Sequence, residues 1–555
     1  MSSASAQEAY PSLTDEQWTR LKAYGTGQAV EVGTVLFRAG DSSYDLILVE
    51  SGVVDVVRTE TPDAPEAVVV SSGAGRFVGE LSLLTGQAAY LTARVSQAGY
   101  VYRVGPVSFR RLMDEDPELS DLILRALLAR RRNLQLGEGA RSIEILGSSM
   151  SAAALALRTY VARQQLPHTW VEIDTSAGAA LARAVSAAPS ELPVVITPTA
   201  VLRHATPGQL AEQLGLSYRP VAGQVLDLVV IGAGPAGLAA AVYGASEGLS
   251  TLLLDSVAAG GQAAASSRIE NYLGFISGIS GADLTGRAAV QALKFGAQIA
   301  SPCEVAELDT SGEQLRIVLT DETEIAARAT VIATGARYRS LRLPRWADFE
   351  GAGIFYAATE LEARACAPNP VAVVGGANSA GQAALYLAGR GSAVTLIVRG
   401  DDLAAGMSAY LADRIVANPV ITVRTSAEVG ALHGDEELEA ITIRTTGAGG
   451  GPPELRQDCR GLFCFIGATP ATEWLSGVAV DDHGFILTDN QLHDTALGSI
   501  WDELGRRPLP FETSQPRVFA TGDVRSGSMK RVAAAVGEGA SAVRSVHVAL
   551  GSVTA

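Results

Sequence analysis

The stretch VLDLVVIGAGPAGLAAAVYGASEGLSTLLLD, residues 225–255, decides the fold of the larger part of this chain of 555 residues. It begins with an apolar run, which predicts a buried strand, and continues through GAGPAG at residues 232–237 into a helical pattern. A second apolar run then ends at Asp255, about 20 residues after the glycines. Strand, glycine-rich turn, helix and acid in this order form the full dinucleotide fingerprint, in which a pyrophosphate approaches the helix N-terminus and the acid binds the adenosine ribose.

A second copy of this pattern lies further along the chain. Residues 371–374 predict a strand, GGANSA at 375–380 a glycine-rich turn, and the residues to about 389 a helix. The next predicted strand, 394–398, ends at Arg399 rather than at an acid. Because a guanidinium attracts the 2′-phosphate that an acid would repel, Arg399 favours NADPH over NADH. The sequence therefore predicts two dinucleotide-binding units.

Composition narrows the class of protein further. Hydrophobic residues make up 47% of the chain and charged residues 18%, which is typical of globular domains. The net charge of −16 argues against nucleic acid as a partner, because phosphate backbones bind clustered lysine and arginine. Four cysteines are too few for a disulfide framework and offer no paired metal ligands, so we expect a reducing compartment and no metal site. The N-terminus lacks an apolar signal core and glycines interrupt the apolar run at 225–245, which predicts a cytoplasmic protein without a membrane span.

Residues 13–136 form the first of three blocks. Short apolar runs separated by glycines predict a compact β-barrel or roll, followed by two helices. Within it, FVGELSLLTGQAA at 77–89 resembles the phosphate-binding cassette of cyclic nucleotide-binding domains. The resemblance implies that a short helix after Gly79 and Glu80 offers backbone N–H groups to a cyclic phosphate, while Glu80 binds the ribose hydroxyl.

The same stretch departs from the cassette at its cation. The family's arginine, nine residues after the glutamate, is Ala89 here, and the proline before it is Ala88. Losing the cation removes a charge-assisted bond worth about 1.5–3 kcal/mol. Two interpretations stay open: a cAMP or cGMP sensor that binds through Gly79 and Glu80, or a retained fold used for packing or docking. The missing arginine favours the second.

Residues 141–217 form the second block, with strands and helices expected in the order β-α-β-α-β-α. This order resembles the thioredoxin or glutaredoxin fold, in which a Cys-x-x-Cys opens the first helix and a cis-proline faces it. Pro193 stands at the cis-proline position, but the turn at 147–151 reads GSSMS. Because no thiol is present, thiol–disulfide chemistry is excluded for this block and a structural or docking role is expected.

The third block, 224–555, resembles the thioredoxin reductases. Beside the two fingerprints, it carries the short motifs that accompany them in that family, namely GGQ at 260–262, IENY at 269–272, ATG at 333–335, FIG at 465–467, TGDV at 521–524 and KRV at 530–532. The resemblance implies FAD on 224–341 and 457–555, NADPH on an inserted domain at 342–456, and a homodimer formed through the FAD domain. The expected fold is multidomain: a β-roll, a thioredoxin-like α/β domain and two Rossmann-type three-layer α/β domains.

The resemblance also implies the residues that hold each cofactor. Those expected at FAD are Gly232, Gly234, Pro235, Ala236, Gly237, Asp255, Gly261, Gln262, Asn271, Val305, Ala333, Thr334, Gly335, Gly522, Asp523, Lys530, Arg531 and Val532. Those expected at NADPH are Gly376, Ala377, Asn378, Ser379, Ala380, Gln382, Arg399 and Ile466. The helix that starts at the KRV motif should point its N-terminus at the flavin.

One family feature is missing. Where a thioredoxin reductase carries Cys-x-x-Cys, this chain has Ala357 and Glu360 at the two cysteine positions. Glu360 is a candidate catalytic residue that moves protons or binds a cationic acceptor; alternatively it is a solvated charge at a helix start. A lone Cys366 nearby is expected in packing, because a single thiol forms no intrachain disulfide.

These observations predict an NADPH-dependent FAD oxidoreductase whose reduced flavin reacts directly with an acceptor that is not a disulfide. A quinone or a small electron-transfer protein fits this description. The alternative is a flavoprotein sensor or scaffold, in which the two N-terminal domains dock partners or bind a nucleotide and turnover is slight.

Overall fold

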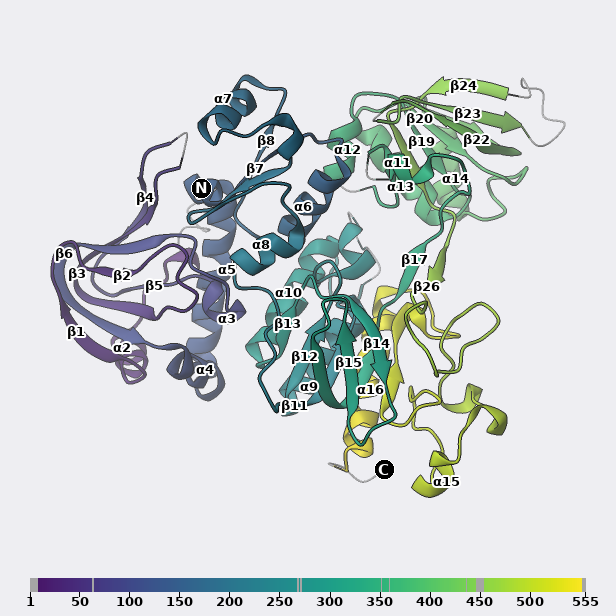
Figure 1. Ribbon diagram of the computed structural model, residues 1–555. Coiled ribbons are helices and arrows are strands. Elements are labelled where there is room, and N and C mark those ends of the chain that lie inside the picture. Colours follow the sequence, from purple (N-terminus) through teal and green to yellow (C-terminus); the bar gives the residue numbers. More distant parts are fainter. Residues whose placement is uncertain are drawn as a thin grey trace.

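The computed structural model describes residues 8–61, 64–266, 269, 272–350, 352–358, 360–435, 437–445 and 454–551. Figure 1 shows four units along the chain: an N-terminal roll, a middle unit, a first dinucleotide unit and an inserted unit. The roll and the middle unit lie beside the first dinucleotide unit. The chain forms most of that unit, continues into the inserted unit, and then returns to complete the first unit with its C-terminal segment. No helix in the described part of the chain is long and apolar enough to cross a membrane.

The roll is a six-stranded antiparallel sheet flanked by helices. The apolar runs at 45–49 and 53–57 belong to one long strand, β3, rather than to two. Gly52, between them, has φ +87° and bends the strand at a bulge without ending it. The elements are α2 (Asp15–Lys22), β1 (Thr26–Val30), β2 (Val35–Phe37), β3 (Leu46–Arg58), β4 (Ala67–Ser72), β5 (Arg76–Val78), α3 (Ser82–Thr85), β6 (Thr92–Val104), α4 (Pro106–Glu115) and α5 (Pro117–Leu136).

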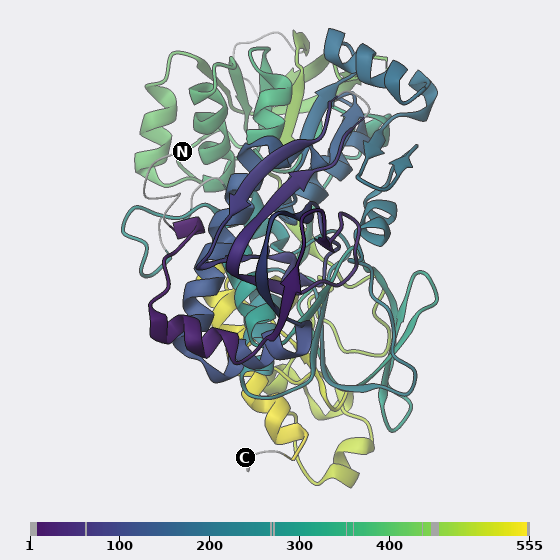
Figure 2. The same ribbon diagram turned by 90° about the vertical axis from the view of Figure 1, so that its left-hand side faces the viewer.

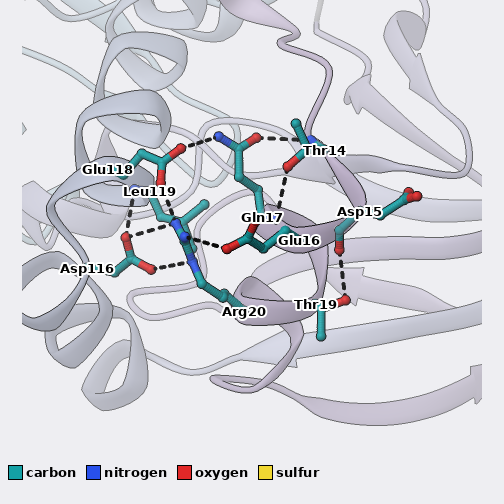
Figure 3. A network of polar contacts seen from close by, with 9 residues as sticks. All are labelled: Thr14, Asp15, Glu16, Gln17, Thr19, Arg20, Asp116, Glu118 and Leu119. Atoms are coloured by element: carbon teal, nitrogen blue, oxygen red, sulfur yellow. Dashed lines mark hydrogen bonds and ion pairs between the residues drawn. The ribbon is translucent and has the colours of Figure 1, made fainter.

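Helix α2 is tied to the start of α5 by a polar network (Figure 3). Arg20 bonds the carboxylates of Asp116 at 3.0 Å and Glu118 at 2.8 Å, and the Gln17 amide donates to Glu118 at 2.6 Å. Arg20 and Asp116 are partly buried and Glu118 is exposed, so the outer pair of the network adds little stability.

The middle unit has a four-stranded sheet in the order β10-β9-β7-β8, with β7 parallel to β8 and the other pairs antiparallel. The sequence predicted the alternation of its first three strands and two helices, and the structure confirms it. The Leu192–Pro193 peptide is cis. The elements are β7 (Glu144–Gly147), α6 (Ala152–Arg163), β8 (Thr169–Glu172), α7 (Ser176–Ala184), β9 (Val194–Ile196), β10 (Val201–Leu202) and α8 (Pro207–Gln213).

The first dinucleotide unit is built on a seven-stranded sheet whose parallel core is β13-β12-β11-β16-β27. Helix α9 packs against both α10 and α16, and all three helices contact strands of the sheet. The elements are β11 (Val225–Ile231), α9 (Pro235–Ser246), β12 (Thr251–Leu254), α10 (Gly281–Lys294), β13 (Gln298–Ala300), β14 (Val305–Asp309), β15 (Leu315–Leu319), β16 (Glu324–Ile332), β27 (Val518–Ala520) and α16 (Val532–Ala549).

The inserted unit has a five-stranded parallel sheet in the order β18-β25-β19-β20-β21, with the three-stranded sheet β22-β23-β24 beside it. Two short antiparallel strands, β17 (Ala336–Tyr338) and β26 (Ala468–Pro470), connect it to the first unit. The other elements are β18 (Ile354–Phe355), α12 (Glu360–Cys366), β19 (Val371–Val374), α13 (Asn378–Gly389), β20 (Val394–Ile397), α14 (Ala409–Val416), β21 (Ile421–Arg424), β22 (Ala427–His433), β23 (Ala440–Thr445), β24 (Glu454–Asp458) and β25 (Gly461–Cys464).

These pairings move one expected boundary. We placed the return to the FAD domain at residue 457, but β25 lies between β18 and β19 in the sheet of the inserted unit. The chain therefore crosses back at β26, about the point where the FIG motif ends. The local sequence carries no sign that β25 pairs between β18 and β19.

The roll and the middle unit share one apolar core. Val30, Ile47 and Val54 of the roll belong to the same buried cluster as Leu157 and Leu214 of the middle unit. A second cluster joins the roll to Val290 of α10 in the first dinucleotide unit. Figure 2, with the roll toward the viewer, shows it lying against the rest of the molecule. The N-terminal units are therefore packed against the first dinucleotide unit and are not separate domains joined only by a linker.

Candidate functional site

A cavity of about 1020 Å³ opens at the carboxyl ends of β11, β12 and β16. Ligands of doubly wound sheets bind at this edge. Of the residues expected at FAD, those that line it are Gly232, Gly234, Pro235, Ala236, Asp255, Gly261, Gln262, Val305, Ala333, Thr334, Gly335, Gly522, Asp523, Lys530, Arg531 and Val532. Gly237 lies buried behind the turn, and Asn271 is outside the described residues.

The glycine-rich turn is shaped by close backbone approaches. Gly232 has φ +104°, and a Cβ there would lie 2.4 Å from the Ala333 carbonyl oxygen. A Cβ on Gly237 would lie 1.8 Å from the Gly232 carbonyl oxygen, so the first turn of α9 can pack only without one. Gly234 caps α9, and no side chain among the described residues bonds this helix end. Its free N–H groups make the turn a site for an anion.

Asp255 forms the floor of the cavity next to the turn. Its carboxylate accepts hydrogen bonds from the backbone N–H of Ala233 at 2.8 Å, Val257 at 2.9 Å and Ala258 at 3.0 Å. Burial raises the pKa of Asp255, and these bonds work against that rise. They hold the side chain fixed and leave one acceptor site of the carboxylate unused by these bonds.

The opposite wall comes from the end of the chain. Burial raises the pKa of Asp523, against the charge of Lys530. Lys530 lies 4.3 Å above the ring of Phe485 and is exposed, as is Arg531, the N-cap of α16. Helix α16 therefore presents its N-terminus and two cations to the cavity, which favours negative charge there.

An aromatic pair lies where the cavity meets the inserted unit. The rings of Tyr338, on β17, and Tyr356, after β18, stack with centroids 5.6 Å apart and an interplanar angle of 4°. Both tyrosines line the cavity. The indole N–H of Trp346 donates to the Tyr356 hydroxyl at 3.0 Å, and that hydroxyl donates to Glu350. The sequence did not single out these tyrosines, because each belongs to a different unit.

Of the residues expected at NADPH, Ser379 at the start of α13 lines the same cavity. Ala377 caps α13, and the Asn378 side chain accepts the backbone N–H of Ser408 at 2.8 Å. Arg399 is exposed after β20 and makes no hydrogen bond or ion pair with any described residue. Elsewhere in the unit, Gly376 lies in the turn, Ala380 is buried, Gln382 is exposed and Ile466 is partly buried.

Glu360 lies away from the cavity lining. Its carboxylate accepts a bond from Arg364 at 2.8 Å and from the Tyr386 hydroxyl at 3.0 Å, and it pairs with Arg390. Burial opposes ionisation, but these partners outweigh it and lower the pKa of Glu360. The geometry makes Glu360 the ionised centre of a polar cluster on α12 and α13.

All four cysteines are free. Burial raises the pKa of Cys366, Cys459 and Cys464 to about 12, so these thiols are not ionised near neutral pH. Cys303 is half-buried, lines the cavity beside Val305 and also has a pKa raised by burial. Among the described residues no group of three or more His, Cys, Asp or Glu side chains could hold a metal.

In the roll, the cassette that resembles a nucleotide site already has an internal partner. Arg131, fully buried on α5, forms two bonds to the Glu80 carboxylate and one to Gln87 at 3.1 Å. Ala88, whose N–H donates to the Leu214 carbonyl of the middle unit at 2.9 Å, is buried together with Ala89. Three arginines follow one another at 130–132 near the end of α5, and two of them, Arg130 and Arg131, are buried beneath the cassette.

Comparisons with known proteins agree with this geometry. Residues 226–539 match the family model described as pyridine nucleotide-disulphide oxidoreductase, and residues 28–116 match the cyclic nucleotide-binding domain. The first match covers more than half of the chain, so this chain belongs to the pyridine nucleotide-disulphide oxidoreductase family. Its thioredoxin reductase-like members, which this chain resembles, bind FAD and NADPH.

Within that family the chain is similar to thioredoxin reductases. It is 32% identical to thioredoxin reductase of Treponema pallidum over 317 residues, which cover 57% of this chain and 94% of the relative. It is 33% identical to NADPH-dependent thioredoxin reductase 3 of Arabidopsis thaliana, over 59% of this chain and 58% of the relative. The crystal structure of Lactococcus lactis thioredoxin reductase in its FR conformation matches with a TM-score of 0.51 and 28% identity, over 59% of this chain and all of that one.

Proposed function

We propose that this chain is an NADPH-dependent FAD oxidoreductase that passes electrons to an acceptor other than a disulfide. The observation that carries the proposal is the state of the cysteines. Neither position of the Cys-x-x-Cys holds one, and burial keeps three of the four thiols protonated. An intrachain dithiol relay has no residues to work with.

The cavity fits FAD by its own features. Its volume is at the upper end of that typical of ligand sites, and the ends of two helices face it. A Cβ at Gly232 would meet the backbone across the turn, so the cradle depends on glycine. Bound there, FAD supplies the chemistry of hydride and electron transfer. In the proposal Asp255 binds the adenosine ribose, the N-terminus of α9 binds the diphosphate, and α16 faces the flavin.

NADPH binds in the proposal at the start of α13. Arg399 receives the 2′-phosphate, because its guanidinium is exposed and uncommitted in the described parts of the chain. Ser379 opens into the FAD cavity, so both dinucleotides reach one shared space. The residues on that path orient the cofactors and exclude water; none of them has to form a covalent bond.

The middle unit is proposed to be a thioredoxin-like domain without its chemistry. Its strand order and directions support this, as does Pro193 before β9. At the turn that precedes α6, the Ser149 N–H and the Trp170 indole N–H both donate to Glu172, at 2.9 Å and 3.0 Å. The role proposed for this domain, and for the roll, is docking and packing. Saturating cAMP should produce no heat in calorimetry; tight binding would revive the sensor alternative for the roll.

The remaining parts of the proposal concern assembly and place. We propose a cytoplasmic homodimer formed through the FAD domain, with that domain on 224–341 and about 468–555, the NADPH domain between these segments, the roll on 13–136 and the thioredoxin-like domain on 141–217. Free cysteines suit a reducing compartment. Sedimentation of the purified protein measures the assembly directly.

Anaerobic stopped-flow spectroscopy tests the main proposal. NADPH should bleach the flavin within the mixing experiment, and NADH should do so far more slowly. The reduced protein is then mixed with a quinone, a ferredoxin or an oxidised thioredoxin. We expect rapid reoxidation by the quinone or the ferredoxin and none by the thioredoxin. Rapid reduction of a protein disulfide would contradict the proposal that the acceptor is not a disulfide. A flavin that NADPH cannot bleach would support the alternative of a sensor or scaffold.

A further inference from the structure

One side chain in the wall of the FAD cavity comes from outside the two dinucleotide units. Arg163 is the last residue of α6 in the middle unit, and it lines the cavity together with the glycine-rich turn and Asp255. The matching region of the oxidoreductase family begins at residue 226, so Arg163 lies well before it. Whatever Arg163 does for the cofactor is a property that the N-terminal extension adds.

The Arg163 guanidinium makes no direct bond within the described part of the chain. The side chain is half-buried, and it forms no hydrogen bond or ion pair with any residue that the structure describes. Burial raises the pKa of Asp255 and of Tyr338, and the charge of Arg163 opposes the rise in both. Arg163 therefore lines the cavity close enough to Asp255 and Tyr338 for its charge to act on both. A half-buried cation that makes no direct bond is costly. The nearby Asp255 carboxylate is already bonded to three backbone N–H groups, so an anion in the cavity would offset that cost.

Neighbouring residues hold Arg163 in this position. One turn earlier, the Tyr160 hydroxyl donates to the Ser301 carbonyl at 3.3 Å, and the Gln164 amide donates to the Ser301 hydroxyl at 2.6 Å. Ser301 is buried and follows β13, two residues before Cys303 at the cavity wall. The end of α6 is thus anchored on both sides of Arg163 to the rim of the cofactor site.

We infer that Arg163 binds the diphosphate of FAD, so that the middle unit completes the cofactor site. The diphosphate carries the negative charge of oxidised FAD, and a guanidinium can contact phosphate oxygens through two N–H groups. The N-terminus of α9 contacts the diphosphate from the sheet side, and Arg163 contacts it from the opposite side. The inference rests on FAD occupying this cavity. Because binding is reciprocal, FAD also stabilises the docking of the middle unit.

The test is the rate of FAD release from the full-length holoenzyme, followed by the rise in flavin fluorescence after dilution. Arg163→Ala should release FAD about 10- to 100-fold faster, as expected for the loss of one charge-assisted contact. Arg163→Lys keeps the charge but not the two-pronged geometry and should show a smaller acceleration. The matched control is Arg183→Ala, which removes an exposed arginine from α7 of the same unit and should stay within about twofold of wild type.

Raising the salt concentration should accelerate release from the wild type more than from Arg163→Ala. If Arg163→Ala fails to fold, Arg163→Lys still decides the matter. Release rates of Arg163→Ala or, in that case, Arg163→Lys that equal that of Arg183→Ala would overturn the inference, as would weaker NADPH binding with unchanged FAD release. A wild-type protein that contains no flavin is a different result, because it contradicts the proposed function itself.

Discussion

In the roll, the carboxylate of Glu80 is paired with Arg131 inside the protein. At the dinucleotide cavity, by contrast, Arg163 makes no hydrogen bond or ion pair with any described residue, and no described side chain caps the N-terminus of α9. Both regions match families that bind nucleotides. In the roll these polar groups bond to one another, and the middle unit packs over them; at the cavity they are open to a ligand. Unpaired groups at a cavity mark a working binding site, because only a ligand offsets their desolvation.

The largest effect on the cavity side of this comparison is expected from a substitution at Gly237. Gly237→Ala places a Cβ about 1.8 Å from the Gly232 carbonyl oxygen, so the turn and α9 must separate. We expect the variant to lose FAD almost completely, which the flavin absorbance of the purified protein measures. The matched control is Gly537→Ala in α16, where nothing lies within 4 Å of a new Cβ and where alanine favours the helix. Equal flavin content in both variants would contradict the role of the turn.

The next largest effect concerns the buried pair in the roll. Arg131→Met leaves Glu80 as a buried charge without its partner, which should cost about 3–5 kcal/mol of stability. Thermal melting of the roll, followed by circular dichroism, should shift down strongly, while the KM for NADPH stays unchanged. Arg132→Met, at the exposed neighbour, is the control. Adding Glu80→Gln to Arg131→Met should recover part of the loss, and no recovery would mean that the pair is not what holds the cassette.

These two sites also mark what the sequence allows one to predict. The glycine-rich turns were found because their geometry is local: a strand, a close backbone approach and an acid lie within one stretch. The burial of Arg131 was missed because its partner, Glu80, is 51 residues away and the end of α5 looks like a solvated basic helix. Arg163 and Tyr338 were missed for the same reason, since each meets the cavity only through packing between units.

A smaller effect is expected at Arg399. Arg399→Ala should raise the KM for NADPH about tenfold, as expected for one lost contact to a phosphate of about 1.4 kcal/mol, and leave that for NADH nearly unchanged. The comparison of the two nucleotides within one variant is its own control, because they differ only in the 2′-phosphate. Steady-state reduction of an artificial dye measures both constants. Parallel changes for NADPH and NADH would remove Arg399 from the phosphate site.

The smallest effect is expected at Glu360, the candidate catalytic residue, whose partners lie on α12 and α13 and at the end of α13. Glu360→Gln should leave the rate of flavin reduction by NADPH within about twofold and lower stability at pH 7 by about 0.5–1 kcal/mol, because the site is partly exposed. The pKa of Glu360 is lowered in the folded protein, so its contribution is present above the unfolded pKa of about 4.3 and disappears as the pH falls through the folded value. The difference in stability between wild type and Glu360→Gln should therefore shrink as the pH falls below about 4.3 and vanish once the pH is well below the lowered pKa of Glu360. A large fall in the rate of reoxidation by the acceptor, without a change in stability, would instead make Glu360 part of the acceptor site. Glu360 would then belong with the groups that bind a ligand, although it is paired inside the protein.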